Sequence, residues 1–202
     1  MKKLVTGTFS ILAISPDSKF MGVAAASGST SVGDRVPYAK PGIGVIATQA
    51  YTDITYGIKG LELLMKGLTP QETLNMLLKK DPKRDLRQVA IMDFKRRKAA
   101  FTGAHAPERR EEIMGKNYVV IGNLLARREI ISDMAEQFES SGGNFIYRMA
   151  KALKAGHESG GDRRGEKSAA LIVVSTEKVE AEIKVDIHDN PIAELFHKLK
   201  LL

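Results

Sequence analysis

Short apolar runs separated by polar turns dominate the first third of the chain, which is the pattern of antiparallel strands. Residues 8–14 and 20–27 are mostly apolar and are predicted to be strands, and the proline-containing cluster at 16–19 predicts the turn of a hairpin. Another short strand is predicted at 42–48, after a loop of small residues. Glycine and alanine are frequent in these runs, so we expect closely packed layers rather than a bulky barrel interior.

Helical spacing of apolar residues follows these strands. Residues 55–66 place leucines and a methionine on one face. Thr69 and Glu72 form a capping box around a proline at the first helical position, which predicts that a second helix begins there. The same spacing predicts further helices at 130–138 and 145–153.

The remaining apolar runs are strand-like, and the last two form the clearest hairpin. Residues 169–174 and 179–185 flank a polar turn, and the strict alternation of the second run predicts one face exposed to water. A short helix is predicted from Pro191. Further strands are predicted at 87–93, 98–102 and 118–121. The order lacks the regular alternation of a parallel sheet, so we predict an α+β layered sandwich formed by one domain, residues 1–202.

Composition and charge exclude several classes of protein. The chain contains no cysteine, which excludes disulfides, thiolate metal sites and a cysteine nucleophile. No apolar run approaches the ~20 residues that cross a bilayer, so no membrane partner is expected. The net charge of +7 comes from scattered basic pairs without interleaved aromatic rings. That pattern disfavours nucleic-acid binding and favours a basic surface suited to anionic substrates.

The N-terminus admits two interpretations. A positive start at residues 1–3 followed by an apolar stretch to Ile14 is typical of a secretory signal, with cleavage expected near Ser15. Small polar residues dilute that stretch, and the cleavage pattern is poor. We therefore expect a cytoplasmic protein, and cleavage near Ser15 is the alternative.

Two glycine-rich segments have the spacing of nucleotide-binding loops but lack other required features. Residues 28–35 follow a strand, yet Asp34 and Arg35 stand where a phosphate loop has lysine and serine or threonine. Residues 42–47 match a dinucleotide fingerprint in spacing, but the segment continues as a strand and opens no helix. The four histidines are dispersed without ligand spacing, so no metal or organic cofactor is expected.

The pair Gly7–Thr8 stands directly before the first predicted strand. If the bond before Thr8 is cleaved, this residue carries both a nucleophilic hydroxyl and a free α-amine, whose unperturbed pKa of about 8 suits proton transfer near neutral pH. Glycine before it tolerates the strained backbone that self-cleavage requires. An ordinary strand entry is the alternative interpretation.

The segment 160–170 is the most unusual of the chain. It combines three glycines, an aspartate, two arginines and a serine in a loop that leads into a strand. A polar turn between helix and strand is one interpretation. The other is a functional loop in which the neighbouring Asp162 and Arg163 orient a nucleophile or hold a carboxylate.

Several segments, taken in order along the chain, form a family-like pattern: Thr8-Phe9-Ser10-Ile11, Val36-Pro37, Tyr56-Gly57, Phe101-Thr102-Gly103, Gly122-Asn123-Leu124-Leu125 and Gly160-Gly161-Asp162-Arg163-Arg164-Gly165. Together they resemble an uncharacterised family, the domain of unknown function 1028. That family is placed in the N-terminal-nucleophile (Ntn) hydrolase superfamily, with proteasome β-subunits and many amidohydrolases. The resemblance implies a four-layer αββα sandwich, with two antiparallel sheets between helical layers.

The resemblance also implies roles for individual residues. Thr8 matches the threonine that opens the first strand, and Gly7 matches the residue before the cut, so residues 1–7 are expected to be a propeptide. The turn of Thr48, Gln49 and Ala50 is similar in place to the segment whose backbone N–H groups form an oxyanion hole.

The chain departs from the proteasome pattern at three places. Ala26 stands roughly where proteasome subunits have an orienting aspartate, and Arg35 only loosely replaces their lysine. Segment 104–112 is unlike the usual family sequence. These departures bear on the proton relay and on whether the chain is active.

The enzymatic hypothesis is an Ntn-type amidohydrolase that cleaves a small-molecule amide with Thr8 as nucleophile. Asn123, Asp162, Arg163 and Ser168 are the candidates for orienting the substrate and the amine. The alternative is a catalytically inactive scaffold or small-molecule binding protein. A homo-oligomer is expected in either case.

Overall fold

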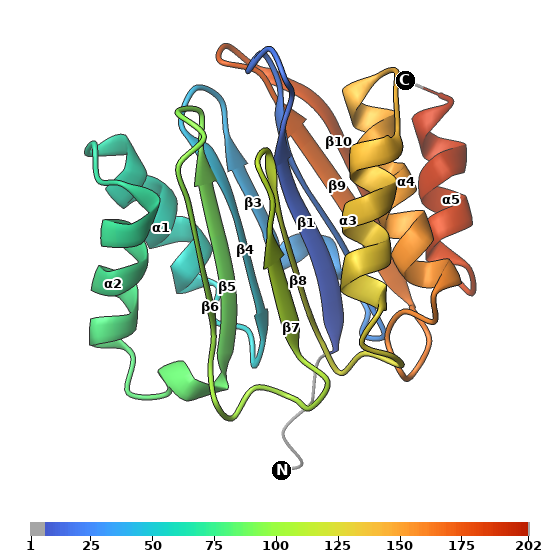
Figure 1. The fold of residues 1–202 in the computed structure, drawn as a ribbon, viewed down its shortest axis with the longest axis horizontal. Coiled ribbons are helices and arrows are strands. Elements are labelled where there is room, and N and C mark those ends of the chain that lie inside the picture. Colours follow the sequence, from blue (N-terminus) through green and yellow to red (C-terminus); the bar gives the residue numbers. More distant parts are fainter. Residues whose placement is uncertain (1–6, 202) are drawn as a thin grey trace.

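Two antiparallel sheets form the middle of the molecule, and helices cover the outer face of each (Figure 1). The computed structural model describes residues 7–201, so the predicted propeptide is described only at Gly7. The start of the alternative signal segment also falls outside the described residues. The four-layer αββα arrangement expected for the chain is confirmed.

Within residues 7–201, the larger sheet has six strands in the order β10-β9-β2-β1-β8-β7. These strands are β1 (Thr8–Ile14), β2 (Met21–Ser27), β7 (Glu111–Met114), β8 (Tyr118–Asn123), β9 (Ser168–Val174) and β10 (Val179–Val185). The smaller sheet has the order β3-β4-β5-β6. Its strands are β3 (Pro37–Lys40), β4 (Gly44–Ala50), β5 (Arg87–Asp93) and β6 (Lys98–Thr102).

The helices form the two outer layers. In Figure 1, α1 and α2 lie on the left against the smaller sheet, and α3, α4 and α5 lie on the right against the larger one. Their bounds are α1 (Thr55–Met65), α2 (Pro70–Lys80), α3 (Ile130–Ser140), α4 (Phe145–Glu158) and α5 (Pro191–Leu199), with short 3₁₀ turns at Val32–Asp34 and Arg84–Leu86. The capping box predicted at Thr69 and Glu72 is present at the start of α2.

Three apolar cores separate the four layers, which explains the burial pattern of the strands. Strands β1, β2, β4, β5 and β9 are buried along their whole length, because each has one face against the other sheet and one against helices. At the edge of the larger sheet, β10 keeps the predicted alternation and exposes Glu182.

Two strands were not predicted from the sequence, and both are short. Strand β3 begins with Pro37, whose missing N–H restricts proline to edges and strand starts, so the residue pattern looked like a loop. Strand β7 is an edge strand with no fully buried residue. Both form through pairing with a longer neighbour, which local sequence does not encode.

The contact between α1 and β3 leads to a stability prediction. A Cβ atom at Gly57 would lie 2.2 Å from the Tyr38 ring, so Gly57→Ala forces the ring or the helix to move. We expect it to lower the free energy of unfolding by about 1–3 kcal/mol. At Gly142 no atom of residues 7–201 lies within 4 Å of an added Cβ, so Gly142→Ala should change stability by less than about 0.5 kcal/mol. Urea unfolding of both variants makes the comparison, and equal losses would contradict the packing account.

Candidate functional site

Four polar residues lie in a row at one end of the larger sheet, one on each of the neighbouring strands β8, β1, β2 and β9. Thr8 is paired with Asn123, and Ser27 is paired with Ser168. Thr8 Oγ1 lies 3.3 Å from Ser27 Oγ, which joins the two pairs. Because side chains alternate along a strand, all four face the smaller sheet, while the next row, with Phe9 and its neighbours, packs against helices. The structure therefore brings Thr8, Asn123 and Ser168 together at one sheet end.

The carbonyl oxygen of Gly7 is the focus of this row. Thr8 Oγ1 lies 2.6 Å from it, Ser27 Oγ lies 2.5 Å from it, and Arg164 Nη2 lies 3.4 Å from it. Thr8 itself is only 1% exposed. The threonine hydroxyl thus lies among hydrogen-bonding groups, directly beside the carbonyl of the bond that self-cleavage would break.

Asp162 holds the loop that supplies Arg164. Its buried carboxylate accepts hydrogen bonds from Gly28 N at 2.8 Å, from Arg164 Nη2 at 2.7 Å and from Arg164 Nε at 3.0 Å. The same carboxylate packs on Gly7, where an added Cβ would lie 2.4 Å from Asp162 Oδ2. Glycine at position 7 is therefore required by close packing, in addition to the backbone freedom considered from the sequence.

A second buried acid fixes the backbone of Asp162. Glu166 Oε1 accepts a hydrogen bond from Asp162 N at 2.8 Å, and Glu166 Oε2 lies 2.7 Å from His157 Nδ1. The Glu166 side chain is 4% exposed. Gly161 has a φ of +55°, and a Cβ there would collide with Glu166 Oε1 at 1.6 Å. A continuous series of contacts thus runs from His157 on α4, through the loop, to the Gly7 carbonyl.

Amide side chains connect the two sheets beneath Thr8. Gln49 Nε2 lies 3.2 Å from Thr8 O and 2.8 Å from Gln88 Oε1, while Ser10 donates to Gln49 Oε1 at 2.6 Å. Asn123 Nδ2 donates to Gln88 Oε1 at 3.0 Å. Asn123 Oδ1 is buried and accepts no hydrogen bond from any residue in the described part of the chain. An acceptor in that position is available to a further donor at the site.

The segment of Thr48, Gln49 and Ala50 was expected to be a turn, but it is the end of strand β4, and its residues differ in whether they face the site. Gln49 faces the other sheet and contacts Thr8, whereas Thr48 lies on the opposite face of β4 and donates to Asp53 O at 3.2 Å. Ala50 has a φ of +70°, so the chain bends sharply where β4 ends.

Arg163 and Ser168 were both predicted to orient the substrate or the amine, and the structure gives them different surroundings. The Arg163 side chain is exposed and makes no hydrogen bond or ion pair with any residue between 7 and 201, whereas its backbone N donates to Leu124 O at 3.0 Å. Ser168 Oγ donates to Ser29 O at 2.5 Å and accepts from Val32 N at 3.1 Å, so it anchors the loop after β2. Arg164, which follows Arg163 in the chain, is the arginine whose side chain reaches Gly7.

The departures at Ala26 and Arg35 have structural explanations. Ala26 packs in the helix-side core, so the residue of β2 that faces Thr8 is Ser27. Burial lowers the pKa of Arg35, and repulsion from Arg164 lowers it further. The two guanidinium groups therefore lie near each other, with the carboxylates of Asp34 and Asp162 beside them.

Sequence reasoning missed Ser27, Gln88, Arg164 and Glu166. Ser27 follows from strand alternation once the pairing of β1 and β2 is known, and Gln88 is the β5 neighbour of Gln49. No feature of the local sequence indicates where the side chains of Arg164 and Glu166 point, because they lie in a glycine-rich loop. Within residues 7–201, no group of three His, Asp or Glu side chains is arranged to hold a metal ion. Among the same residues, no helix has the length and apolarity to cross a membrane.

Comparison with known proteins covers nearly the whole chain. The crystal structure of a protein from Silicibacter pomeroyi, described as belonging to DUF1028, superimposes with a TM-score of 0.90 at 31% identity, over 96% of this chain and 88% of that one. Anbu (ancestral β-subunit) from Yersinia bercovieri gives a TM-score of 0.46 at 10% identity, over 96% and 93%. No curated protein matches. The model of the "family of unknown function (DUF1028)" matches residues 8–195, beginning at the threonine beside the Gly7 carbonyl, and the chain belongs to that family.

Proposed function

We propose that this protein is the precursor of an Ntn-type amidohydrolase that cleaves itself between Gly7 and Thr8. The observation that supports it best is the environment of the Gly7 carbonyl oxygen, which has two hydroxyl groups and a guanidinium around it. One of these hydroxyls belongs to Thr8, the residue that would attack. The others are placed to stabilise negative charge on that oxygen.

Self-cleavage would proceed in two steps. Thr8 Oγ1 attacks the Gly7 carbonyl carbon, the C–N bond breaks, and the hydroxyl proton passes to the departing Thr8 nitrogen, leaving an ester. Water then hydrolyses that ester, which releases Gly7 with a carboxyl group and frees both the hydroxyl and the α-amine of Thr8. Residues 1–7 would be the propeptide of a single domain.

The mature site would use the same groups on an external amide. The Thr8 α-amine, with an unperturbed pKa of about 8, takes the hydroxyl proton as the hydroxyl attacks and returns it to the leaving amine. Ser27 and Arg164 occupy positions beside the acyl oxygen, and the backbone at Gln49 and Ala50 is the further candidate for oxyanion donors. Asn123 Oδ1, a buried acceptor without a donor among residues 7–201, suits the liberated amine or a substrate N–H.

The charge of the site indicates a substrate class. Arg35 and Arg164 lie close enough for their charges to repel, and Arg164 is balanced by Asp162. A carboxylate on the acyl side of a small amide would relieve that repulsion. We therefore propose a small, anionic amide as substrate.

Ser27→Ala tests the proposed acyl-oxygen site. Removing one donor of this kind from a developing oxyanion typically costs about a hundredfold in rate, so self-cleavage should slow by about that factor. Ser140→Ala, at the exposed end of α3, is the matched control and should cleave at the normal rate, because within residues 7–201 the Ser140 hydroxyl donates only to backbone carbonyls of its own helix. Mass spectrometry of timed samples gives both rates, and equal rates would remove Ser27 from the account.

An amidase assay tests the proposed activity. The protein is incubated with a panel of N-acyl amino acids and with their uncharged acyl-amide analogues, and the released amine is measured. We expect turnover of the anionic members, which Thr8→Ala abolishes. A chain that remains full length and releases no amine from any member would support the inactive homo-oligomeric scaffold instead.

A further inference from the structure

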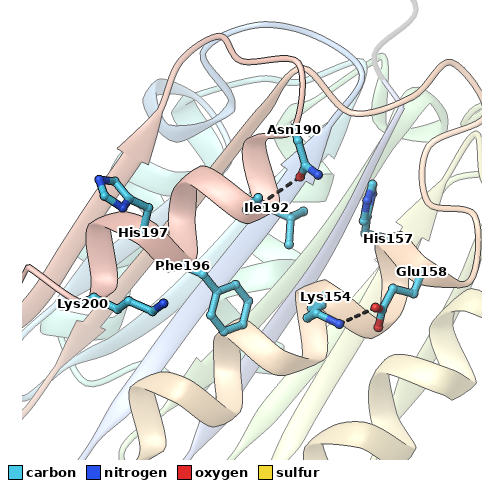
Figure 2. A pocket seen from close by; sticks show the side chains of 9 residues that line it. Lys154, His157, Glu158, Asn190, Ile192, Phe196, His197 and Lys200 are labelled. Carbon is cyan, nitrogen blue, oxygen red and sulfur yellow. Dashed lines mark hydrogen bonds and ion pairs between the residues drawn. The ribbon is translucent and has the colours of Figure 1, made fainter.

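A groove between α4 and α5 lies outside the Thr8 site and has a volume of about 390 Å³, within the range of small-molecule sites. Both helices contribute to it at helical spacing, so one face of each lines the same space (Figure 2). The lining residues are Lys154, His157, Glu158, Asn190, Ile192, Ala193, Phe196, His197 and Lys200.

The lining combines an apolar surface with an excess of basic groups. Ile192 and Phe196 supply the apolar part, and in Figure 2 the Phe196 ring lies between the side chains of Lys200 and Lys154. Lys154 is paired with Glu158, the one acidic residue of the lining. The Lys200 ammonium makes no hydrogen bond or ion pair with any described residue, so one positive charge at the Phe196 end is left without a counterpart.

We propose that this groove binds a small organic carboxylate, with its charge at Lys200 and Lys154 and its apolar body over Phe196 and Ile192. A bare inorganic anion would leave the apolar surface uncovered, and an uncharged apolar molecule would leave the lysine without a partner. A flat carboxylate satisfies both, because an aromatic body can pack on the Phe196 ring while its charged group remains partly hydrated.

His157 connects this groove with the Thr8 site. Its ring lines the groove, while Nδ1 is 2.7 Å from Glu166 Oε2, and Nε2 has no hydrogen-bond partner among residues 7–201. Glu166 in turn holds Asp162 N at 2.8 Å. A ligand that moves the His157 ring therefore changes the acceptor that fixes Asp162, and through it the loop beside Gly7. Neither the binding nor this connection requires that the chain be an amidohydrolase.

Titration of the ¹⁵N-labelled full-length protein with sodium benzoate at constant ionic strength tests the binding. We expect saturable shifts of backbone amides in α4 and α5, and much weaker effects with benzyl alcohol, which lacks the charge. The double variant Lys154→Gln, Lys200→Gln should weaken benzoate binding roughly tenfold, since each partly exposed ion pair contributes only modestly. Lys59→Gln on the exposed face of α1 is the matched control and should bind normally. Equal shifts with benzyl alcohol, or normal affinity of the double variant, would overturn the proposal.

The same titration tests the connection through His157. Because Asp162 N–H donates to Glu166, its amide resonance should shift in parallel with those of α4 as benzoate saturates the groove. An Asp162 resonance that stays in place at saturation would show that the groove binds without reaching the Thr8 loop. Since no amide cleavage is measured, failure here is distinct from failure of the proposed hydrolase activity.

Discussion

We expect Thr8→Ala to leave the chain uncut before position 8 and without amidase activity. The alanine chain lacks the hydroxyl that lies 2.6 Å from the Gly7 carbonyl oxygen, so neither the ester of self-cleavage nor an acyl-enzyme can form. Loss of a nucleophile removes the whole catalytic unit, and we expect the rate of amide cleavage to fall about a thousandfold or more. Intact-mass spectrometry and amine release measure the two effects.

Thr8→Ser separates chemistry from packing. Serine keeps the hydroxyl and loses one methyl group at a buried position, so cleavage should persist, although more slowly. Urea unfolding shows whether either variant is destabilised. If Thr8→Ala cleaved itself or hydrolysed amides as the original chain does, Thr8 would not be the nucleophile.

We expect Asp162→Asn to lower the stability of the protein substantially. Asp162 is 1% exposed, and its carboxylate accepts from both Gly28 N and Arg164, so an amide in its place loses the ion pair and turns one acceptor into a donor. Because the Arg164 side chain is 34% exposed, water compensates part of the loss, and we expect about 2–3 kcal/mol less free energy of unfolding. Self-cleavage should also slow, since Arg164 is no longer held at the Gly7 carbonyl.

Asp189→Asn is the matched control for this substitution. Asp189 is exposed and its carboxylate makes no hydrogen bond or ion pair within residues 7–201, so stability should change by less than about 0.5 kcal/mol. Denaturant unfolding compares the two variants at one pH. If Asp162→Asn were as stable as Asp189→Asn, the buried contacts of Asp162 would contribute little and its loop would need another explanation.

The layered fold could be predicted from sequence because its main elements are locally encoded. The capping box at Thr69, the hairpin turn after Ile14 and the alternation of β10 each determine an element boundary or a face by short-range chemistry. Strand β3 escaped prediction because its four residues become a strand only by pairing with β4. Edge strands of this kind depend on tertiary contacts.

The candidate site was predicted only in part, because local sequence does not determine which way loop side chains point or how strands are aligned. The loop with Asp162 was recognisable as unusual, but sequence could not distinguish the exposed side chain of Arg163 from that of Arg164, which turns toward Gly7. At the end of β2, the sequence pointed to Ala26 as the residue near Thr8, whereas the side chain beside Thr8 is that of Ser27, one residue further along the strand. Register and loop direction come from long-range packing, and local pattern carries neither.

The most direct test is the mass of the purified full-length chain, followed over several days at neutral pH. We expect the intact species to be replaced by one that begins at Thr8, with a peptide ending at Gly7 released in equal amount. Amide hydrolysis should appear at the same rate as the new species. A chain that stays intact while it hydrolyses amides, or one cut near Ser15 instead, would contradict the assignment of Thr8.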